Sequence, residues 1–291
     1  MLIKPIFLFD AFVVLVMFSI GLRVTGGELI DVMRSRTILI RTLVANCALI
    51  PAIGLLLAYV FPLPRDVMIG LLLLAAIPGT PIAMQFTKQV KSRLAFAAGM
   101  TAVLSLVSIV MTPLAVEIFP QAARQNQRPI LSLVGAIFLF IALPLLAGLG
   151  VARRAPEFAR RMVMPLLVLA TFIFVFVMWE TRLVRRQALL AIAGHGTILA
   201  IVLLFLSALL IGWMIGGDPD MRRVLATSTS MRNVVIVLYI ARYCFPGTNV
   251  YMVPIAYLSI MVPANLLFHL CFVAWQRFHH PQAQAQPTAS S

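Results

Sequence analysis

Long apolar stretches alternate with short polar segments along this chain, and the polar segments are often basic. A membrane-spanning helix needs about 20 mostly apolar residues. Nine stretches meet this requirement: 5–24, 37–61, 66–91, 93–119, 129–151, 159–179, 187–215, 221–244 and 249–276. The connections are short, so the pattern predicts one all-α polytopic membrane domain over residues 1–280. The tail 281–291 is rich in Gln, Ala, Pro and Ser, which predicts disorder.

Composition supports a membrane protein and argues against a soluble one. Of the 291 residues, 62% are hydrophobic and 11% are charged, whereas a soluble domain carries about 25% charged residues. The net charge of +14 does not indicate nucleic-acid binding, because Lys and Arg cluster between the apolar stretches. The three cysteines lack metal-site spacing. We therefore expect no metal, no cofactor and no nucleic-acid partner, and the oligomeric state stays open.

The positions of Lys and Arg predict the orientation in the membrane. One set of alternate connections holds 14 of these residues and the other holds 8. The richer side is expected to be cytoplasmic. This places the N-terminus outside and the C-terminus inside a plasma membrane of the bacterial inner-membrane type. Arg232 belongs to neither side, because it lies within a span.

The third span contains a helix-breaking sequence, Pro78-Gly79-Thr80-Pro81. Proline lacks an amide donor and its ring clashes with the preceding turn, so the segment interrupts the helix. At 1.5 Å per residue, Pro78 lies ~18 Å from the outer end of the span. This is close to the middle of a hydrocarbon core of about 30 Å.

The eighth span contains an unusual polar run in which Ser228, Thr229 and Ser230 precede Arg232 and Asn233. Hydroxyl groups can satisfy backbone groups that a local unwinding sets free. Upstream, an aspartate followed by proline, at 218 and 219, is typical of a helix start.

Arg232 lies ~16 Å from the inner end of the eighth span, so both interruptions lie near the midplane. The two spans enter the membrane from opposite sides. We therefore predict two broken, crossing helices of the kind found in inverted-repeat transporters. An arginine at this depth indicates a functional site, although it could instead serve as a structural clamp on backbone carbonyls.

Several motifs resemble the bile acid:sodium symporter family. Residues 77–112 resemble its Cys-Pro-Gly-Gly-x-x-Ser-Asn pattern and the Leu-Ser-x-x-x-Thr pattern of the next helix. Residues 17–22 resemble its Met-Phe-x-Met-Gly-Leu. Asn46 with Pro51 is similar to its Gln-x-x-x-x-Pro, and residues 230–233 resemble its Gly-Met-Gln-Asn. The likeness extends over nearly the whole chain, in the nine-helix form.

This resemblance implies a panel and a core subdomain, interleaved along the chain, that move an organic anion by alternating access. It also implies two sodium sites at the helix crossover. Here the sequence departs from the family: alanine and methionine occupy positions 83 and 84, alanine occupies 97, and Ser228 stands where the family has glutamate. Of the usual oxygen ligands, Thr101 and Asn46 remain. Sodium needs several oxygen ligands, so we expect no sodium coupling.

The charge of Arg232 suggests what replaces the sodium ions. In the family, one glutamate and two sodium ions give the site a net charge of +1. Arg232 alone gives the same charge, and its planar guanidinium suits a carboxylate or sulfate. We expect it to act as a tethered cation in a site formed by Arg232, Asn233, Ser228, Thr229, Ser230, Asn46, Thr101, Pro78, Gly79, Thr80 and Pro81.

The leading hypothesis is a secondary transporter for a small organic anion. A sodium- or proton-coupled symporter of the same family is the alternative. Asp10 lies ~8 Å from the outer end of its span, shallow enough to be an outer-vestibule or interfacial residue, and is otherwise a candidate for proton coupling or for pairing with Arg232. A non-transport membrane subunit has little need of broken helices. An intramembrane enzyme would need a clustered nucleophile and base, and the sequence offers no such motif.

Overall fold

The computed structural model describes residues 5–23, 30, 32–79, 94–118, 130–180, 194 and 196–279. Thr80, Pro81, the second half of the expected third span and the tail 281–291 lie outside these residues. Within them the chain forms helices α1 (Pro5–Arg23), α3 (Arg36–Val44), α4 (Ile50–Val60), α5 (Arg65–Ala76), α7 (Leu94–Ile118), α8 (Ile130–Ile137), α9 (Leu143–Arg154), α10 (Pro156–Glu180), α12 (Thr197–Ile215), α13 (Pro219–Ser230), α14 (Val234–Cys244) and α15 (Met252–His279).

The described part of the chain consists of helices joined by loops, without strands, and contains seven stretches that are long and apolar enough to cross a membrane. They correspond to seven of the nine expected spans. The other two expected spans, 5–24 and 66–91, contain α1 and α5, and the total of nine stays a prediction. Many large apolar side chains on the outside of the bundle are exposed, including Tyr59, Phe172 and Trp179. This surface suits lipid rather than water, and the chain is an integral membrane protein.

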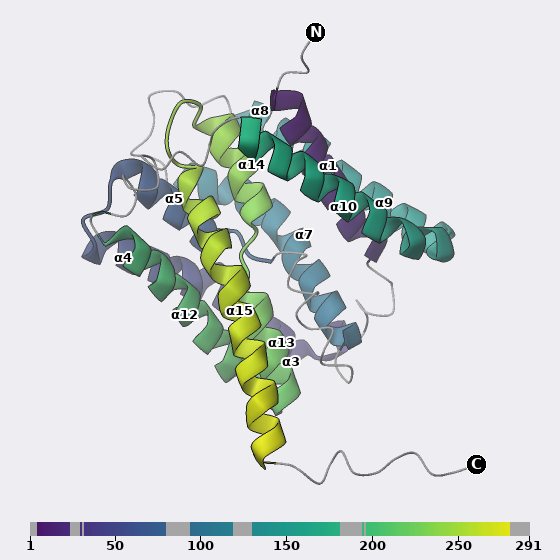
Figure 1. Cartoon of the computed structure of the whole chain (residues 1–291), viewed down its shortest axis with the longest axis vertical. Helices are drawn as coiled ribbons and strands as arrows, with labels where there is room; N and C mark the ends of the chain where they lie inside the picture. The colour runs from purple at the N-terminus through teal and green to yellow at the C-terminus, as the bar shows by residue number, and fades with distance from the viewer. Residues whose placement is uncertain are drawn as a thin grey trace.

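The helices form two groups that lie side by side (Figure 1). In the first group, α1 packs along both α9 and α10. In the second, α13 packs along α12, α4 packs on α5, and α15 crosses both α5 and α12. The buried core is continuous through both groups and includes residues of α1, α5, α14 and α15.

Two short π-helical turns, Ala45–Leu49 and Phe138–Ala142, interrupt otherwise continuous α-helices. Each turn is followed, after one further residue, by a proline, at Pro51 and Pro144. Proline removes one hydrogen bond and crowds the carbonyl four residues earlier, so a wider turn before it relieves the clash. The first turn contains Asn46, which the distorted helix presents to the centre of the protein.

Glycines allow α1 and α9 to cross closely. A Cβ atom on Gly148 would lie 2.3 Å from the carbonyl oxygen of Phe18 and 3.0 Å from the Cα atom of Gly21. Small residues at such crossings let helix backbones approach each other within membranes.

We expect Gly148→Ala to destabilise the protein by about 1–3 kcal/mol, because the added methyl group overpacks this crossing. Gly150→Ala is the matched control on the same helix, since a Cβ atom there meets nothing within 4 Å. The control should be neutral, or stabilising by up to about 1 kcal/mol, because alanine favours helix. Thermal unfolding in one detergent compares the two variants, and equal melting temperatures would contradict the close crossing.

Candidate functional site

The interruption after α5 begins at the residue before proline. Ile77 has φ −104° and ψ 97°, which is extended backbone, and a residue before proline is disfavoured in helix. Gly79 then adopts φ +73°, a conformation that side chains rarely tolerate. A Cβ atom on Gly79 would lie 2.7 Å from that of Leu104. The sequence therefore ends α5 at Ala76 and brings the backbone of Gly79 directly onto α7.

The eighth span is interrupted between α13 and α14, as expected from the sequence. The side chain of Asp218 caps the start of α13 by accepting from the amide of Met221 at 2.9 Å, which confirms the predicted helix start. Met231 is extended, and Asn233 starts α14 by accepting from the amide of Ile236 at 3.2 Å. A cap from its own side chain lets a new helix begin at mid-depth.

The interruption is shorter than the sequence predicted. Ser228, Thr229 and Ser230 were expected in the unwound segment, but they form the last turn of α13. The hydroxyl groups of Ser228 and Ser230 donate to the carbonyls of Leu225 and Thr227, each at 3.3 Å. Such bonds to the preceding turn are compatible with helix, so the hydroxyl run does not unwind it.

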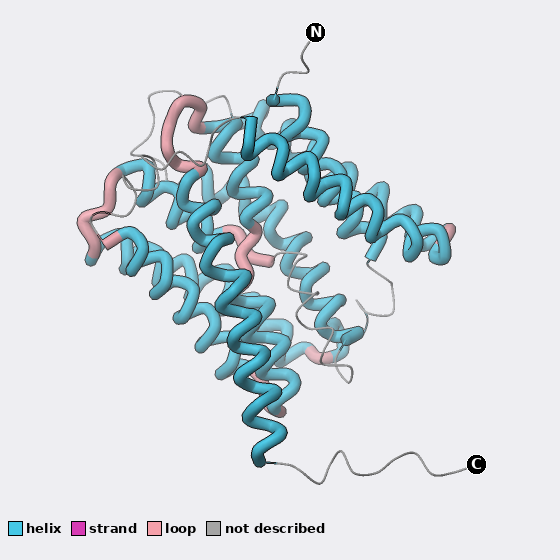
Figure 2. The backbone as a smooth tube through the Cα atoms, in the orientation of Figure 1, coloured by secondary structure: helices cyan, strands magenta, loops and turns pink. Residues whose placement is uncertain are grey.

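The two interrupted segments lie in the middle of the bundle (Figure 2) and hydrogen-bond to each other. The amide of Asn233 donates to the carbonyl of Ile77 at 3.3 Å. The guanidinium of Arg232 donates from Nε to the carbonyl of Leu74 at 2.9 Å and from Nη2 to that of Ala75 at 2.5 Å. The interrupted segment of span eight therefore donates hydrogen bonds to the carbonyl groups at the end of α5, which have no donor within their own helix.

Arg232 is completely buried, with an exposed fraction of 0%. Its third hydrogen bond runs from Nη1 to Oδ1 of Asn46 at 2.7 Å. The last carbonyls of a helix have no partner within the helix and carry a partial negative charge. The guanidinium thus sits in a cradle of three oxygens, those of Leu74, Ala75 and Asn46, and neutralises the end of α5.

Asn46 connects the cradle to α13. Its Nδ2 atom donates to the carbonyl of Thr42 at 2.9 Å and lies 3.4 Å from the hydroxyl of Thr229. One turn away, the hydroxyl of Thr42 is buried and has no hydrogen-bond partner among the described residues. Sequence reasoning did not single out Thr42, although a threonine four residues before an asparagine in an apolar helix marks the same polar face.

Helix α15 holds the end of α13 with neutral donors and acceptors. The hydroxyl of Tyr257 donates to the carbonyl of Ser230 at 2.6 Å, and the hydroxyl of Ser230 lies 3.3 Å from Oδ1 of Asn265. Neither Tyr257 nor Asn265 was predicted. An available signal was the pair of polar residues four positions apart on α15, Asn265 and His269, in a mostly apolar helix.

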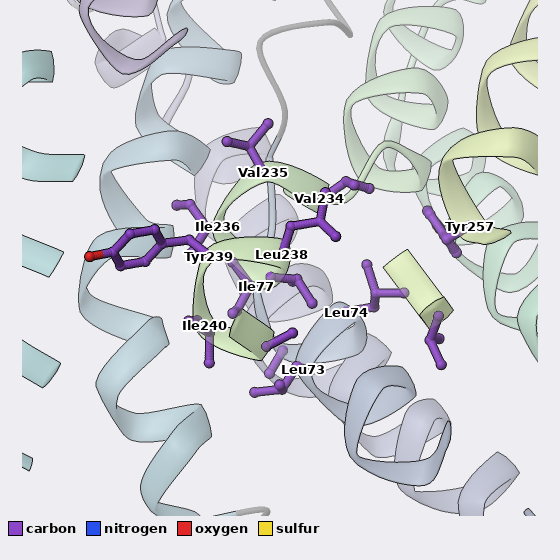
Figure 3. Close-up of a cluster of buried hydrophobic side chains, with 14 of the residues drawn as sticks. Leu73, Leu74, Ile77, Val234, Val235, Ile236, Leu238, Tyr239, Ile240 and Tyr257 are labelled. Atoms are coloured by element: carbon purple, nitrogen blue, oxygen red, sulfur yellow. The ribbon is translucent and has the colours of Figure 1, made fainter. Parts of the chain in front are cut away.

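Apolar side chains enclose the meeting point. Leu73 and Leu74 of α5, and Ile77 just after it, belong to the same buried apolar cluster as Val234 and Leu238 of α14 (Figure 3). This shell keeps water from the buried hydrogen bonds of Arg232. A charge in such surroundings needs full hydrogen bonding, which the three-oxygen cradle supplies.

Three predicted residues are not brought into contact with Arg232. The hydroxyl of Thr101 donates to the carbonyl of Ala97 on its own helix, α7, at 2.8 Å. Asp10 interacts electrostatically with Arg242, near the far end of α14. The pairing of Asp10 with Arg232 is therefore not observed. Ser228 bonds within α13, as described above.

Within the residues that the structure describes, no three His, Cys, Asp or Glu side chains come together as metal ligands. The additional polar contact near the site is from Nδ2 of Asn233 to the hydroxyl of Ser108, at 3.5 Å. The polar groups that converge here are thus amides, hydroxyls, carbonyls and one guanidinium, which suit binding by hydrogen bonds.

Comparison with known proteins finds curated proteins that are similar to part of this chain. The P3 proteins of Homo sapiens, Bos taurus and Mus musculus are 26%, 25% and 24% identical to the chain over 201 residues. Each match covers 68% of this chain and 41% of the relative, so less than half of each relative is matched. Residues 11–211, more than half of the chain, match the family described as the Sodium Bile acid symporter family. The expected resemblance is confirmed, and the chain belongs to this family of membrane transporters.

Proposed function

We propose that this protein is a secondary transporter that moves a small organic anion by alternating access without sodium coupling. The observation that carries the proposal is the three-oxygen cradle of Arg232, at the contact between the two interrupted segments. Carbonyl and amide oxygens are also the ligands that hard metal cations take in proteins. A guanidinium held by such oxygens acts as a cation that never leaves the site.

The hydroxyl groups that remain as candidate sodium ligands support the absence of sodium coupling. Thr101 and Ser228 both donate to carbonyls of their own helices. The sequence has alanine or methionine at three further positions where the family has oxygen ligands. The site therefore has little to offer a sodium ion beyond the oxygens that Arg232 already holds.

The burial of Arg232 suggests how it favours an anion. Three of its donors are engaged and its side chain is not exposed. Its role is therefore charge balance through the local electric field rather than direct contact with the substrate. The N-terminus of α14 adds a partial positive charge at the same depth. Asn233 and Thr229 lie beside this region and are equally buried, so direct contact between them and an anion requires the site to open during alternating access.

We further propose the nine-span, inverted-repeat arrangement, with the interruptions of spans three and eight as its crossing point. In this proposal α1, α9 and α10 form part of the panel, and the helices around α5, α13 and α14 form the core. The distribution of Lys and Arg supports an N-terminus outside and a C-terminus inside a plasma membrane of the bacterial inner-membrane type.

The absence of sodium coupling gives a direct prediction. The melting temperature of the purified protein should be the same in sodium chloride and in potassium chloride. A bound ion stabilises a protein according to its occupancy, by about 2.7 kcal/mol at one hundred times its Kd. A thermal-shift series at constant ionic strength measures this, and a parallel screen of organic anions identifies stabilising substrates.

Thr101→Ala is the control for this series, because Thr101 is the remaining hydroxyl candidate for a sodium ligand on α7. It should leave the sodium and potassium curves superimposed. A higher melting temperature in sodium that Thr101→Ala abolishes would show that the protein is the sodium-coupled alternative. The proposed absence of sodium coupling would then be wrong.

A further inference from the structure

A second buried polar cluster joins α13 to α15, away from the cradle of Arg232. His269 of α15 is 1% exposed, and Arg223 of α13 is 3% exposed. Nδ1 of His269 lies 3.2 Å from Nη2 of Arg223, and Nε2 lies 2.9 Å from the hydroxyl of Thr227. Nothing in the proposed anion site uses these three residues.

The partners of His269 determine which ring nitrogen carries its hydrogen. A guanidinium nitrogen can only donate, so Nδ1 must accept from Arg223. Nε2 therefore carries the hydrogen and donates to the hydroxyl of Thr227. In this arrangement the imidazole is neutral, and its basic nitrogen is occupied by a hydrogen bond from a cation.

The charged groups around His269 come mainly from α13. Nη1 of Arg223 lies 4.0 Å from Oδ1 of Asp220, and its Cζ atom lies 4.4 Å from the centre of the Phe272 ring. The Nε atom of Arg223 is buried with no partner among the described residues. Arg222 turns away, donating to the carbonyl of Gly216.

The other helices that pack against α15 place their titratable groups elsewhere. Helix α12 has none, and its Trp213 makes edge contacts with the rings of Phe268 and Phe272. Asp66 of α5 bonds to the amide of Asn249, just before α15 begins. Helix α14, which packs against α15 near its N-terminal end (Figure 1), carries four titratable residues: Tyr239, Arg242, Tyr243 and Cys244.

We propose that His269 is a proton-binding site and that the proton it takes up is the coupling ion of the transporter. One proton from water adds to Nδ1, and both ring nitrogens become donors. Arg223 can no longer donate to Nδ1, and two positive charges then lie side by side. Arg223 moves toward Asp220, and its hydrogen bond to His269 breaks, while Nε2 of His269 still donates to Thr227.

Protonation of His269 affects the anion site because α13 is the first half of the interrupted span. Its other end carries Ser230, which Tyr257 and Asn265 of α15 hold. Loss of the Arg223–His269 hydrogen bond weakens the hold of α15 on α13, the helix whose far end borders Arg232. This inference rests on the proposed function, since it assigns the coupling ion of that transporter.

Trp213 provides a readout that needs no substrate, because it packs on the two aromatic rings that flank His269 in sequence. The test uses a variant with Trp213 as its only tryptophan, made by Trp179→Phe and Trp275→Phe. Its fluorescence is followed from pH 3 to 9 in detergent. We expect a one-proton transition that His269→Gln removes. His195→Gln, which removes a histidine elsewhere in the chain, is the control and should leave the transition unchanged.

Arg223→Gln tests the same site without touching the histidine. Loss of the neighbouring positive charge should raise the midpoint of the transition by about one pH unit or more. Size-exclusion profiles and melting temperatures at pH 8 establish that each variant is folded. A transition that survives His269→Gln, or a midpoint that Arg223→Gln leaves in place, would overturn the proposal.

Flux measurements in proteoliposomes then test the coupling. A pH gradient should accelerate uptake of an anion found in the screen, and His269→Gln should retain uptake but lose the acceleration. Equal acceleration in both proteins would overturn the coupling role. Failure of the proposed function would look different, since the fluorescence transition would persist while anion flux was absent or required sodium.

Discussion

Replacing Arg232 with glutamine should lower both the stability of the protein and its transport of anions. The change leaves the buried carbonyls of Leu74 and Ala75 without the donors that now satisfy them. Each unsatisfied buried group costs about 1–3 kcal/mol. We expect a total loss of about 2–6 kcal/mol, and transport per folded molecule should fall because the fixed positive charge is gone.

The lysine variant separates charge from hydrogen-bond geometry. Arg232→Lys keeps a positive charge but not the planar fork that reaches three oxygens, so it should recover only part of the stability and little of the transport. Arg242→Gln, on the same span and half-buried, is the matched control and should cost about 1 kcal/mol or less. Neither Arg232 variant should become sodium-dependent.

Thermal unfolding and flux normalised to folded protein measure these effects together. Near-normal flux in Arg232→Gln would contradict the tethered-cation role and leave Arg232 as a structural clamp. Normal stability in the same variant would contradict the three-oxygen cradle itself.

Replacing Gly79 with alanine should be the most destabilising of the single-methyl changes. The position combines φ +73° with a Cβ site 2.7 Å from Cβ and 2.9 Å from the carbonyl carbon of Leu104. Left-handed backbone costs a residue with a side chain about 1–2 kcal/mol. Overpacking against α7 adds about 1–3 kcal/mol, so we expect a loss of about 3 kcal/mol.

Gly247 separates these two contributions. It has nearly the same backbone angle, φ +79°, but nothing lies within 4 Å of its Cβ site. Gly247→Ala should therefore show only the backbone cost, and transport should remain. Unfolding experiments on both variants compare the losses, and similar values would mean that the contact between Gly79 and α7 is not close.

Local chemistry made several features predictable. Apolar length predicted the spans, since lipid requires long helices with all backbone groups bonded internally. Pro78 predicted the end of α5, because the residue before proline leaves the helical region. Asp218 with the following proline predicted the start of α13. Each of these signals acts within a few residues along the chain.

The extent of the interruption in span eight was not predictable in the same way. No proline marks it, and the hydroxyl run before it is helical. The segment is held open by contacts from elsewhere: Ile77 accepts from the amide of Asn233, and Tyr257 donates to the carbonyl of Ser230. Hydroxyl residues fit both helix and unwound backbone, so only these partners decide between them.

The sequence by itself therefore determined that this is a helical membrane protein of the Sodium Bile acid symporter family with an arginine inside one span, because hydrophobic length and the positions of charged residues are properties of the chain. Only the tertiary structure decided what that charge does. Arg232 finds its acceptors at Leu74, Ala75 and Asn46, all more than 150 residues away. His269 finds Arg223 and Thr227 only because α15 packs on α13. Hydrogen-bond partners for a buried charge depend on which helices pack together, and no local pattern contains that information.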